Sequence, residues 1–136
     1  MKNEKIIVID AAGGVLGRVA SLGAKKALLG YEVKIVNCND VLLVGEKRNI
    51  IETYMIKRVR GGSSRNGPHF PKSPERIMKR TIRGMLSYKL GRGGAAFKRI
   101  MCYNEFPKEF DGKEKISMKR ELRTEAIKLT ELSREL

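Results

Sequence analysis

The sequence predicts an α/β fold with three layers (α/β/α) around a small, four-stranded, mostly parallel sheet. Two apolar, β-branched runs at 5–10 and 32–36 are separated by a stretch with helical periodicity. A strand–helix–strand unit of this length implies a right-handed parallel crossover. The chain has 136 residues, 41% of them hydrophobic, which fits one globular domain spanning 1–136.

The first 30 residues supply the start of this unit. Lys5–Asp10 is expected to be a short buried strand because its residues are mainly apolar and β-branched. Ala11–Gly14 is expected to be a turn. Val15–Leu29 follows as a helix, since its apolar residues recur at every fourth position and form one face. Gly30 stands where a C-terminal helix cap belongs.

A second and a third strand are expected next. Glu32–Val36 again combines apolar and β-branched residues, and Asn37–Asp40 is a polar turn. Val41–Val44 is the third strand candidate. Gly45 ends it, and Lys47–Lys57 then shows the spacing of a helix with one apolar side.

Two glycine-containing basic loops are expected to flank a helix in the middle of the chain. Arg58–Pro71 is long and rich in Gly and Pro. Ser73-Pro74-Glu75 is a helix start, with an N-cap hydroxyl, Pro at the first position and an acid in the first turn. That helix is expected to extend to about Ser87, and Tyr88–Ala96 is the second loop. Both loops carry few apolar anchors, so we expect them to be mobile until an anionic partner orders them.

The last part of the chain is expected to hold one more strand and one more helix. Arg99–Tyr103 is the fourth strand candidate, and a charged connector follows it. Ile116–Leu136 has the periodicity of an amphipathic helix. The predicted domain therefore consists of an α/β core with basic loops (1–104) and a charged connector with a C-terminal helix (105–136).

The charge of the chain is concentrated in its middle. The net charge is +14, and residues 45–100 alone carry +12, against +2 for 1–44 and zero for 101–136. Such a block repels itself unless an anionic partner neutralises it. A membrane-binding basic helix favours Trp or Phe on its apolar face, yet the chain has no Trp. Nucleic acid is therefore the expected partner, and the scarcity of aromatic residues favours recognition of backbone and shape.

The predicted helix 74–87 carries most of this argument. Its apolar residues Met78, Ile82, Met85 and Leu86 form one stripe, and its cations form another; Glu75 is the only acid in it. Arginines in the stripe and the loops suit bidentate phosphate binding. The candidate nucleic-acid contacts of the stripe, the two loops and the ends of the flanking elements are Lys57, Arg58, Arg60, Arg65, Arg76, Lys79, Arg80, Arg83, Lys89, Arg92 and Lys98.

A rival motif follows the first strand. Ala12-x-Gly14-x-x-Gly17 approximates the dinucleotide fingerprint G-x-G-x-x-G, in the expected strand–turn–helix context. The second strand ends at Asn37 instead of the acid that would bind a ribose hydroxyl. The alternatives are a small nucleotide-binding enzyme that uses this turn, or tight helix–strand packing at Gly14 and Gly17.

Other chemistry finds little support in the sequence. Cys38 and Cys102 are far apart and form no CxxC pair, which argues against a disulfide scaffold or zinc ribbon and fits a reducing cytoplasm. His69 has no ligand-spaced companions, so we expect no metal and no cofactor. No catalytic group of residues, signal peptide or membrane-spanning run is evident. We expect neither an enzyme with a small-molecule substrate nor a membrane protein.

Four separated motifs occur along the chain: DAAGGVLGRVAS (Asp10–Ser21), IVNCND (Ile35–Asp40), RGGSSRNGPHF (Arg60–Phe70) and RTIRGML (Arg80–Leu86). Their order resembles the L13 family of large-subunit ribosomal proteins. The third motif and the RGML stretch, with Lys89 and Arg92-Gly93 after it, resemble the archaeal and eukaryotic branch of that family. Ser87 and Glu105 depart from the family pattern, where Pro and Gly are usual.

The resemblance implies a fold, partners and further site residues. The fold would be an α/β/α arrangement around a four-stranded parallel sheet. The role would be to bind large-subunit ribosomal RNA, to help it fold, and to contact neighbouring ribosomal proteins in cytoplasmic ribosomes. The RNA-facing positions would be Gly17, Arg18, the segment 57–70 with His69, and the segment 76–93.

Overall fold

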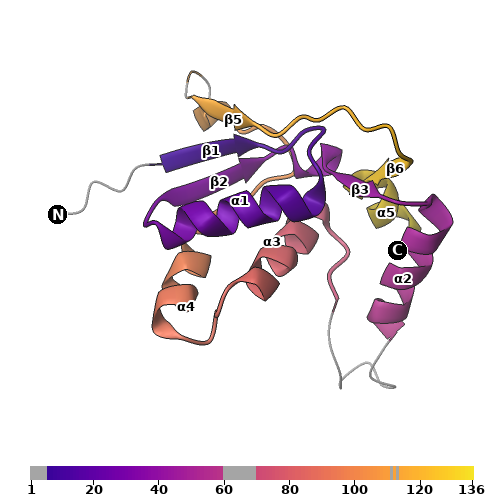
Figure 1. Cartoon of the computed structure of the whole chain (residues 1–136), viewed down its shortest axis with the longest axis horizontal. Helices are drawn as coiled ribbons and strands as arrows, with labels where there is room; N and C mark the ends of the chain where they lie inside the picture. The colour runs from indigo at the N-terminus through magenta and orange to yellow at the C-terminus, as the bar shows by residue number, and fades with distance from the viewer. Residues whose placement is uncertain (1–5, 60–69, 111, 113) are drawn as a thin grey trace.

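A four-stranded sheet forms the centre of the computed structural model, which describes residues 6–59, 70–110, 112 and 114–136. All neighbouring strands of this sheet are paired in parallel (Figure 1). In their order across the sheet, the strands are β4 (Ile100–Cys102), β2 (Glu32–Val36), β1 (Ile6–Asp10) and β5 (Lys115–Ser117). The predicted α/β fold and the first, second and fourth predicted strands are therefore confirmed.

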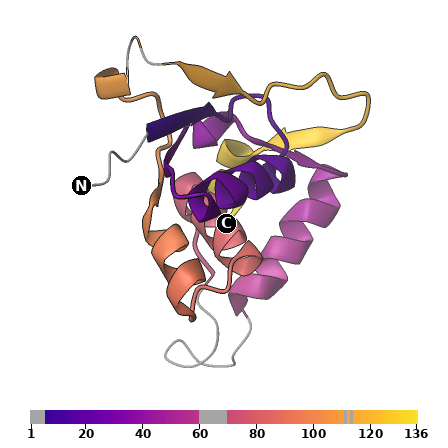
Figure 2. The same cartoon turned by 60° about the vertical axis from the view of Figure 1, so that its left-hand side comes forward.

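Three helices cover one face of the sheet: α1 (Leu16–Leu28), α3 (Pro74–Met85) and α4 (Gly91–Lys98) (Figures 1 and 2). The connections from β1 to β2 and from β2 to β4 step across the sheet in the same direction, so right-handed crossovers place both on one face. Gly30, with φ of 101°, follows α1 as predicted. Fully buried side chains of the resulting core include Ile9, Val19, Ile35, Ile77 and Ile82.

The opposite face of the sheet is covered more thinly. The connection from β4 to β5 steps back across the sheet, and a right-handed crossover places it on this face. It contains the 3-10 helix η2 (Lys108–Phe110), whose Phe110 packs against Val8 and Val36. The rings of Phe110 and Tyr103 are 5.6 Å apart in an edge arrangement. The third layer is therefore a short 3-10 helix with aromatic anchors instead of an α-helix.

The third predicted strand forms, but outside the main sheet. β3 (Leu42–Val44) pairs antiparallel with β6 (Ala126–Lys128) in a separate two-stranded sheet. Between β2 and β3 the chain turns through η1 (Cys38–Asp40), which follows Asn37 in a left-handed conformation (φ 59°). The remaining place in the main sheet is taken by β5, an exposed edge strand without an apolar pattern.

The long helix predicted over Ile116–Leu136 is wrong. This part of the chain forms β5, β6 and only a short helix, α5 (Leu129–Glu135). A crossing segment (118–125) joins the two strands, and the Met118 N–H donates to the carbonyl oxygen of Asp10 (3.0 Å). Such backbone bonds to distant residues replace helical bonds, so tertiary contacts override the helical periodicity.

The second predicted loop, Tyr88–Ala96, is also wrong, because α4 begins inside it at Gly91. The glycines have a packing role here. A Cβ atom on Gly93 would lie 2.2 Å from the carbonyl oxygen of Ser87, so the helix packs on the preceding turn at a distance that only glycine allows. The expected mobility of this segment rested on its being a loop, and most of it is helical instead.

The helix predicted over Lys47–Lys57 is confirmed as α2 (Lys47–Val59), and it includes Arg58 from the first predicted loop. Residues 60–69 of that loop lie outside the described residues. At Phe70 the described chain resumes beside α2, where the rings of Phe70 and Tyr54 are 5.2 Å apart.

The start of α3 is confirmed, but its cap comes from elsewhere in the chain. Pro74 is at the first helical position, as predicted, while the Ser73 side chain makes no capping hydrogen bond. Instead, the Glu75 N–H donates to Oδ1 of Asn104, at 3.0 Å. Asn104 lies just after β4, so this bond joins the start of α3 to the edge of the sheet.

Replacing Asn104 with alanine is therefore expected to lower the free energy of unfolding by about 1 kcal/mol, the usual effect of losing a helix cap. Ser73→Ala removes the hydroxyl that the sequence indicates as the cap, and it should lower the free energy of unfolding by only a few tenths of the Asn104→Ala effect. Urea unfolding of both variants measures the difference. Equal losses in the two variants would contradict the assignment of the cap to Asn104.

Candidate nucleic-acid interface

The basic stripe of α3 lines a hollow on the protein surface. Its volume is about 220 Å³, and among the described residues no acid lines it. The opposite side of α3 is anchored in the core by Ile77, Met78 and Ile82, whereas Met85, predicted on that side, is exposed. The cations lie on one side of α3 and the buried apolar residues on the other, so the predicted two-faced helix is confirmed. We call this site the α3 hollow; its lining residues are Pro71, Arg76, Lys79, Arg80, Arg83 and Phe97.

Aromatic rings lie against several of these cations. The Arg80 guanidinium is 4.7 Å from the centre of the Phe70 ring, and the Arg83 guanidinium is 5.1 Å from that of Tyr88. Lys57 Nζ lies 4.9 Å from the centre of the Tyr54 ring, and burial raises the pKa of Tyr54. These contacts hold the cations in place through cation–π attraction.

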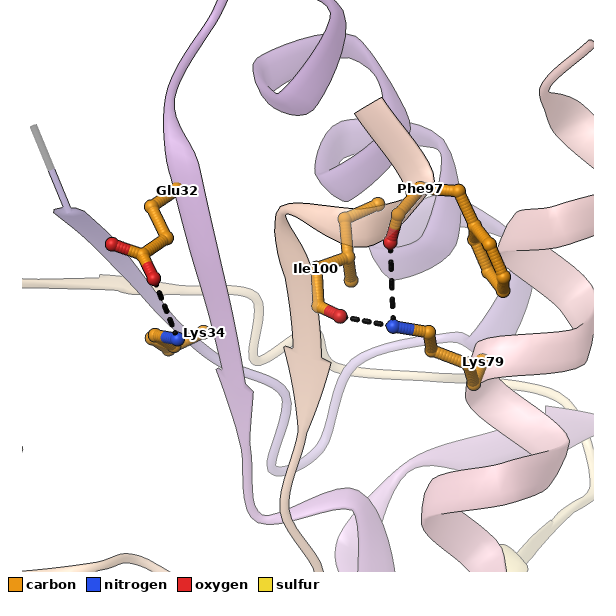
Figure 3. A network of polar contacts seen from close by, with 5 residues as sticks. All are labelled: Glu32, Lys34, Lys79, Phe97 and Ile100. Atoms are coloured by element: carbon orange, nitrogen blue, oxygen red, sulfur yellow. Dashed lines mark hydrogen bonds and ion pairs between the residues drawn. The ribbon is translucent and has the colours of Figure 1, made fainter. Parts of the chain in front are cut away.

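Lys79 differs from the other cations of the α3 hollow (Figure 3). Its Nζ donates to the carbonyl oxygens of Phe97 (3.3 Å) and Ile100, and it lies 4.6 Å from the centre of the Phe97 ring. Burial lowers the pKa of this lysine. Lys79 therefore fastens α3 to the end of α4 and the start of β4, and much of its donor capacity is used inside the protein.

Where the structure describes them, the other predicted contacts do not line the α3 hollow. Lys89 and Lys98 are exposed near the two ends of α4, and Arg92 lines a separate hollow of about 360 Å³ beside Leu90. Arg58 donates through Nη1 to the backbone oxygen of Leu136 at 2.9 Å, which joins α2 to the chain beyond α5. Three further candidates lie outside the described residues: Arg60, Arg65 and His69.

Gly17 and Arg18 lie in a second, larger hollow, between α1 and the crossing segment. Its volume is about 570 Å³. Sequence reasoning missed three of its cations. Lys25 follows Arg18 at helical spacing on the polar side of α1, so periodicity could have indicated it; Lys119 and Arg120 fell in the wrongly predicted helix. We call this site the α1 hollow; its polar and glycine lining residues are Gly17, Arg18, Ser21, Lys25, Ser117, Lys119 and Arg120.

The glycine turn after β1 uses several of the backbone donors that could bind a nucleotide phosphate in hydrogen bonds within the protein. The Ala12 N–H donates to Oδ1 of Asp10 (3.1 Å), and the Gly13 N–H to the carbonyl oxygen of Asp40 (3.0 Å). Gly14 makes the close contact predicted for it, because a Cβ atom there would meet Val19 of α1 as well as Met118 of the crossing segment. The same prediction is wrong for Gly17, which has open space around it.

The two cysteines are free and lie near each other. Cys38 is buried, as expected for a small apolar residue, and a hydrogen bond with the Cys102 thiol, together with burial, raises its pKa. Within the described ranges, no group of three His, Cys, Asp or Glu residues could hold a metal ion. No helix in that same part of the chain is long and apolar enough to cross a membrane.

A parallel α/β core that carries cation-lined hollows is typical of a protein that binds a polyanion. Comparison with known proteins identifies the family. The chain belongs to the ribosomal protein L13 family, whose model matches residues 4–109.

Relatives extend this match to almost the whole chain. The large ribosomal subunit protein uL13 of Methanocaldococcus jannaschii is 46% identical over 132 residues, which cover 95% of this chain and 96% of that protein. The protein of the same name from Natronomonas pharaonis is 41% identical over 96% of this chain and 90% of its own. The protein of the same name from Thermoplasma acidophilum is 38% identical over 95% of this chain and 96% of its own length. At this coverage, the matches extend beyond the end of the family model and include the crossing segment.

Proposed function

We propose that this protein is a structural constituent of the large ribosomal subunit in the cytoplasm, where it acts as a single RNA-binding domain. It binds large-subunit ribosomal RNA, supports the folding of that RNA and contacts neighbouring ribosomal proteins. It works without a cofactor or a small-molecule substrate. The names of the relatives support the ribosomal role, and the closed backbone of the glycine turn argues against the nucleotide-binding alternative.

The α3 hollow is the observation that carries RNA binding. In the part of the chain that the structure describes, four cations line it and no acid does. Cations held this close repel one another, and phosphate groups relieve the repulsion while releasing their own counterions. Arg76 is exposed at the hollow, and arginine binds phosphate oxygens in a bidentate manner. A continuous phosphate backbone supplies several such groups at once.

The aromatic residues favour recognition of RNA backbone and shape over base stacking. Phe70 contacts Tyr54 edge to face and lies under Arg80, and Tyr88 lies beside Arg83. Ring faces that are occupied by the protein's own cations are not available as platforms for unpaired bases. We infer that the cations meet phosphates of folded RNA.

The four cations of the α3 hollow have different roles in this proposal. Arg76, Arg80 and Arg83 contact phosphates. Lys79 is a positioning residue, because its ammonium group is bonded to the carbonyl oxygens of Phe97 and Ile100. It fixes the distance between α3 and α4 and thereby the shape of the hollow.

The test is the salt dependence of RNA binding by Arg76→Ala and Arg80→Ala. The probe is a transcript of the large-subunit ribosomal RNA of Methanocaldococcus jannaschii, and the dissociation constant is measured from low to high salt. Each variant should reduce the slope of log affinity against log salt by somewhat less than one unit. Arg48→Ala, which removes an exposed arginine paired with Glu52 on α2, should leave the slope unchanged.

Sedimentation tests the ribosomal assignment itself. Tagged protein should sediment with large subunits, and the double variant Arg76→Ala/Arg80→Ala should be depleted from that fraction. Unchanged slopes in both arginine variants would place the α3 hollow away from RNA. Protein that stays at the top of the gradient would contradict the ribosomal role.

A further inference from the structure

The fold brings together two thiols that are far apart in the sequence. Cys38 begins η1, and Cys102 ends β4. In the parallel ladder between β2 and β4, Cys102 is paired with Ile35. The turn through η1 then places Cys38 Sγ 3.9 Å from the carbonyl oxygen of Ile35, and the Tyr103 N–H donates to the same oxygen at 2.8 Å. The Cys38 side chain and the residue after Cys102 therefore meet at one carbonyl group.

Further contacts hold the two thiols side by side. The Cys38 N–H donates to the carbonyl oxygen of Tyr103 at 3.0 Å, which fixes η1 against the end of β4. Both side chains belong to the same apolar core, in which Cys38 is buried and Cys102 is half-buried. A hydrogen bond joins their sulfur atoms. A disulfide requires Cβ atoms about 3.5–4.5 Å apart, and thiols in direct contact approach that arrangement with little movement of the backbone.

Helix α3 gives the two thiols different surroundings. Glu75, in its first turn, interacts electrostatically with Cys38, and Lys79, one turn later, interacts with Cys102. Burial and a nearby carboxylate disfavour a thiolate, whereas a nearby ammonium group favours it. Cys102 is also the more accessible of the two residues. It is therefore the sulfur that reacts first with an oxidant from outside, and Cys38 is the buried partner.

We propose that Cys38 and Cys102 form an oxidisable dithiol, which closes to an internal disulfide on exposure to hydrogen peroxide. The Cys102 sulfur attacks one peroxide oxygen, the O–O bond breaks, and a water leaves with the thiol proton, so that Cys102 becomes a sulfenic acid. The Cys38 sulfur then attacks the Cys102 sulfur, the S–O bond breaks, and a second water leaves with the Cys38 proton. The two sulfurs lose two electrons in total, and these reduce the peroxide to two waters.

The disulfide would stabilise the part of the chain that carries the α3 hollow. It closes a covalent loop that contains α2, α3 and α4. A cross-link restricts the unfolded chain, and its effect on stability grows with the length of the loop. Because cytoplasmic thiols are ordinarily kept reduced, the open dithiol is the resting state. Oxidation thus locks the cationic half of the protein in its folded form, and reduction releases it.

The test is treatment of the full-length protein with hydrogen peroxide, followed by a count of thiols after unfolding. The wild type should change from two titratable thiols per chain to none, and it should remain a monomer. Peptide mass spectrometry should find the peptide with Cys38 joined to the peptide with Cys102. The oxidised protein should melt at least about 5 °C above the reduced protein, and dithiothreitol should reverse the shift.

Two variants separate the roles of the sulfurs. Cys102→Ser keeps all six methionines and so controls for their oxidation; it should retain its Cys38 thiol and show no rise in melting temperature. In Cys38→Ala, the sulfenic acid at Cys102 lacks its partner and should be trapped by dimedone. Alkylation of the folded wild type, which needs no substitution, should modify Cys102 well before Cys38.

The outcomes that would contradict the proposal are equally specific. Two free thiols after peroxide treatment, a sulfinic acid at Cys102 beside a free Cys38, or disulfide-linked dimers would overturn the dithiol. An internal disulfide that leaves the melting temperature unchanged would overturn its stabilising role.

Discussion

Gly93→Ala is expected to lower the free energy of unfolding by roughly 3 kcal/mol, at the upper end of the usual cost of overpacking. The added Cβ atom would lie 2.2, 2.5 and 2.9 Å from the O, C and N atoms of Ser87, and all three belong to the backbone. The turn cannot yield easily, because the Leu90 N–H donates to the same Ser87 carbonyl oxygen at 2.9 Å. Chemical denaturation followed by circular dichroism measures the loss.

Gly91→Ala is the matched control in the same helix. Its Cβ atom would meet nothing within 4 Å, so the variant should be as stable as the wild type or more stable by up to about 1 kcal/mol. Gly93→Ala should also weaken RNA binding, since Lys79 joins the end of α4 to the α3 hollow. Equal stability of the two variants would show that α4 does not pack on the Ser87 turn.

Gly14→Ala is expected to lower the free energy of unfolding by about 2 kcal/mol. A Cβ atom there would lie 2.8 Å from Cγ2 of Val19, 2.9 Å from Cβ of Met118 and 3.0 Å from the Met118 carbonyl oxygen. The first contact is in the core, and the other two displace the crossing segment. The measurement is urea unfolding, together with hydrogen exchange at Met118, whose N–H is bonded to Asp10 and should lose protection.

Gly17→Ala separates packing from function in the same motif. Because its Cβ atom would meet nothing within 4 Å, the protein should keep its stability or gain up to about 1 kcal/mol. The new methyl group faces the α1 hollow, so RNA binding should nevertheless weaken. A stability loss as large as that of Gly14→Ala would mean that the two glycines have the same packing role.

The elements that sequence reasoning predicted well are those whose signals are local. β1, α1 and β2 follow from an apolar run, a helical period and a closing glycine, and α3 follows from Pro74 at its start. The basic stripe on α3 was predictable for the same reason. Helical geometry alone places residues three and four positions apart on one side.

The crossing segment and α4 were not predictable, because they depend on contacts between segments that are distant in the sequence. The residues after 115 have helical periodicity, but their backbone groups bond to the turn after β1 and to the end of β3, where the Gly45 N–H donates to the Glu125 carbonyl oxygen. Those bonds form an edge strand and a crossing segment in place of a helix. The glycines around Gly93 indicate a loop in sequence, and only the neighbouring turn shows that they allow a helix to pack.

The sequence by itself determined the α/β class, the order of the first elements and a cationic surface on α3, because periodicity and composition act over a few neighbouring residues. The tertiary structure decided the surroundings of each cation. Lys79 and Arg76 are equivalent in the stripe, yet only Lys79 meets backbone carbonyl oxygens. Lys119 and Arg120 join Arg18 in one hollow because long-range backbone bonds hold the crossing segment on the glycine turn.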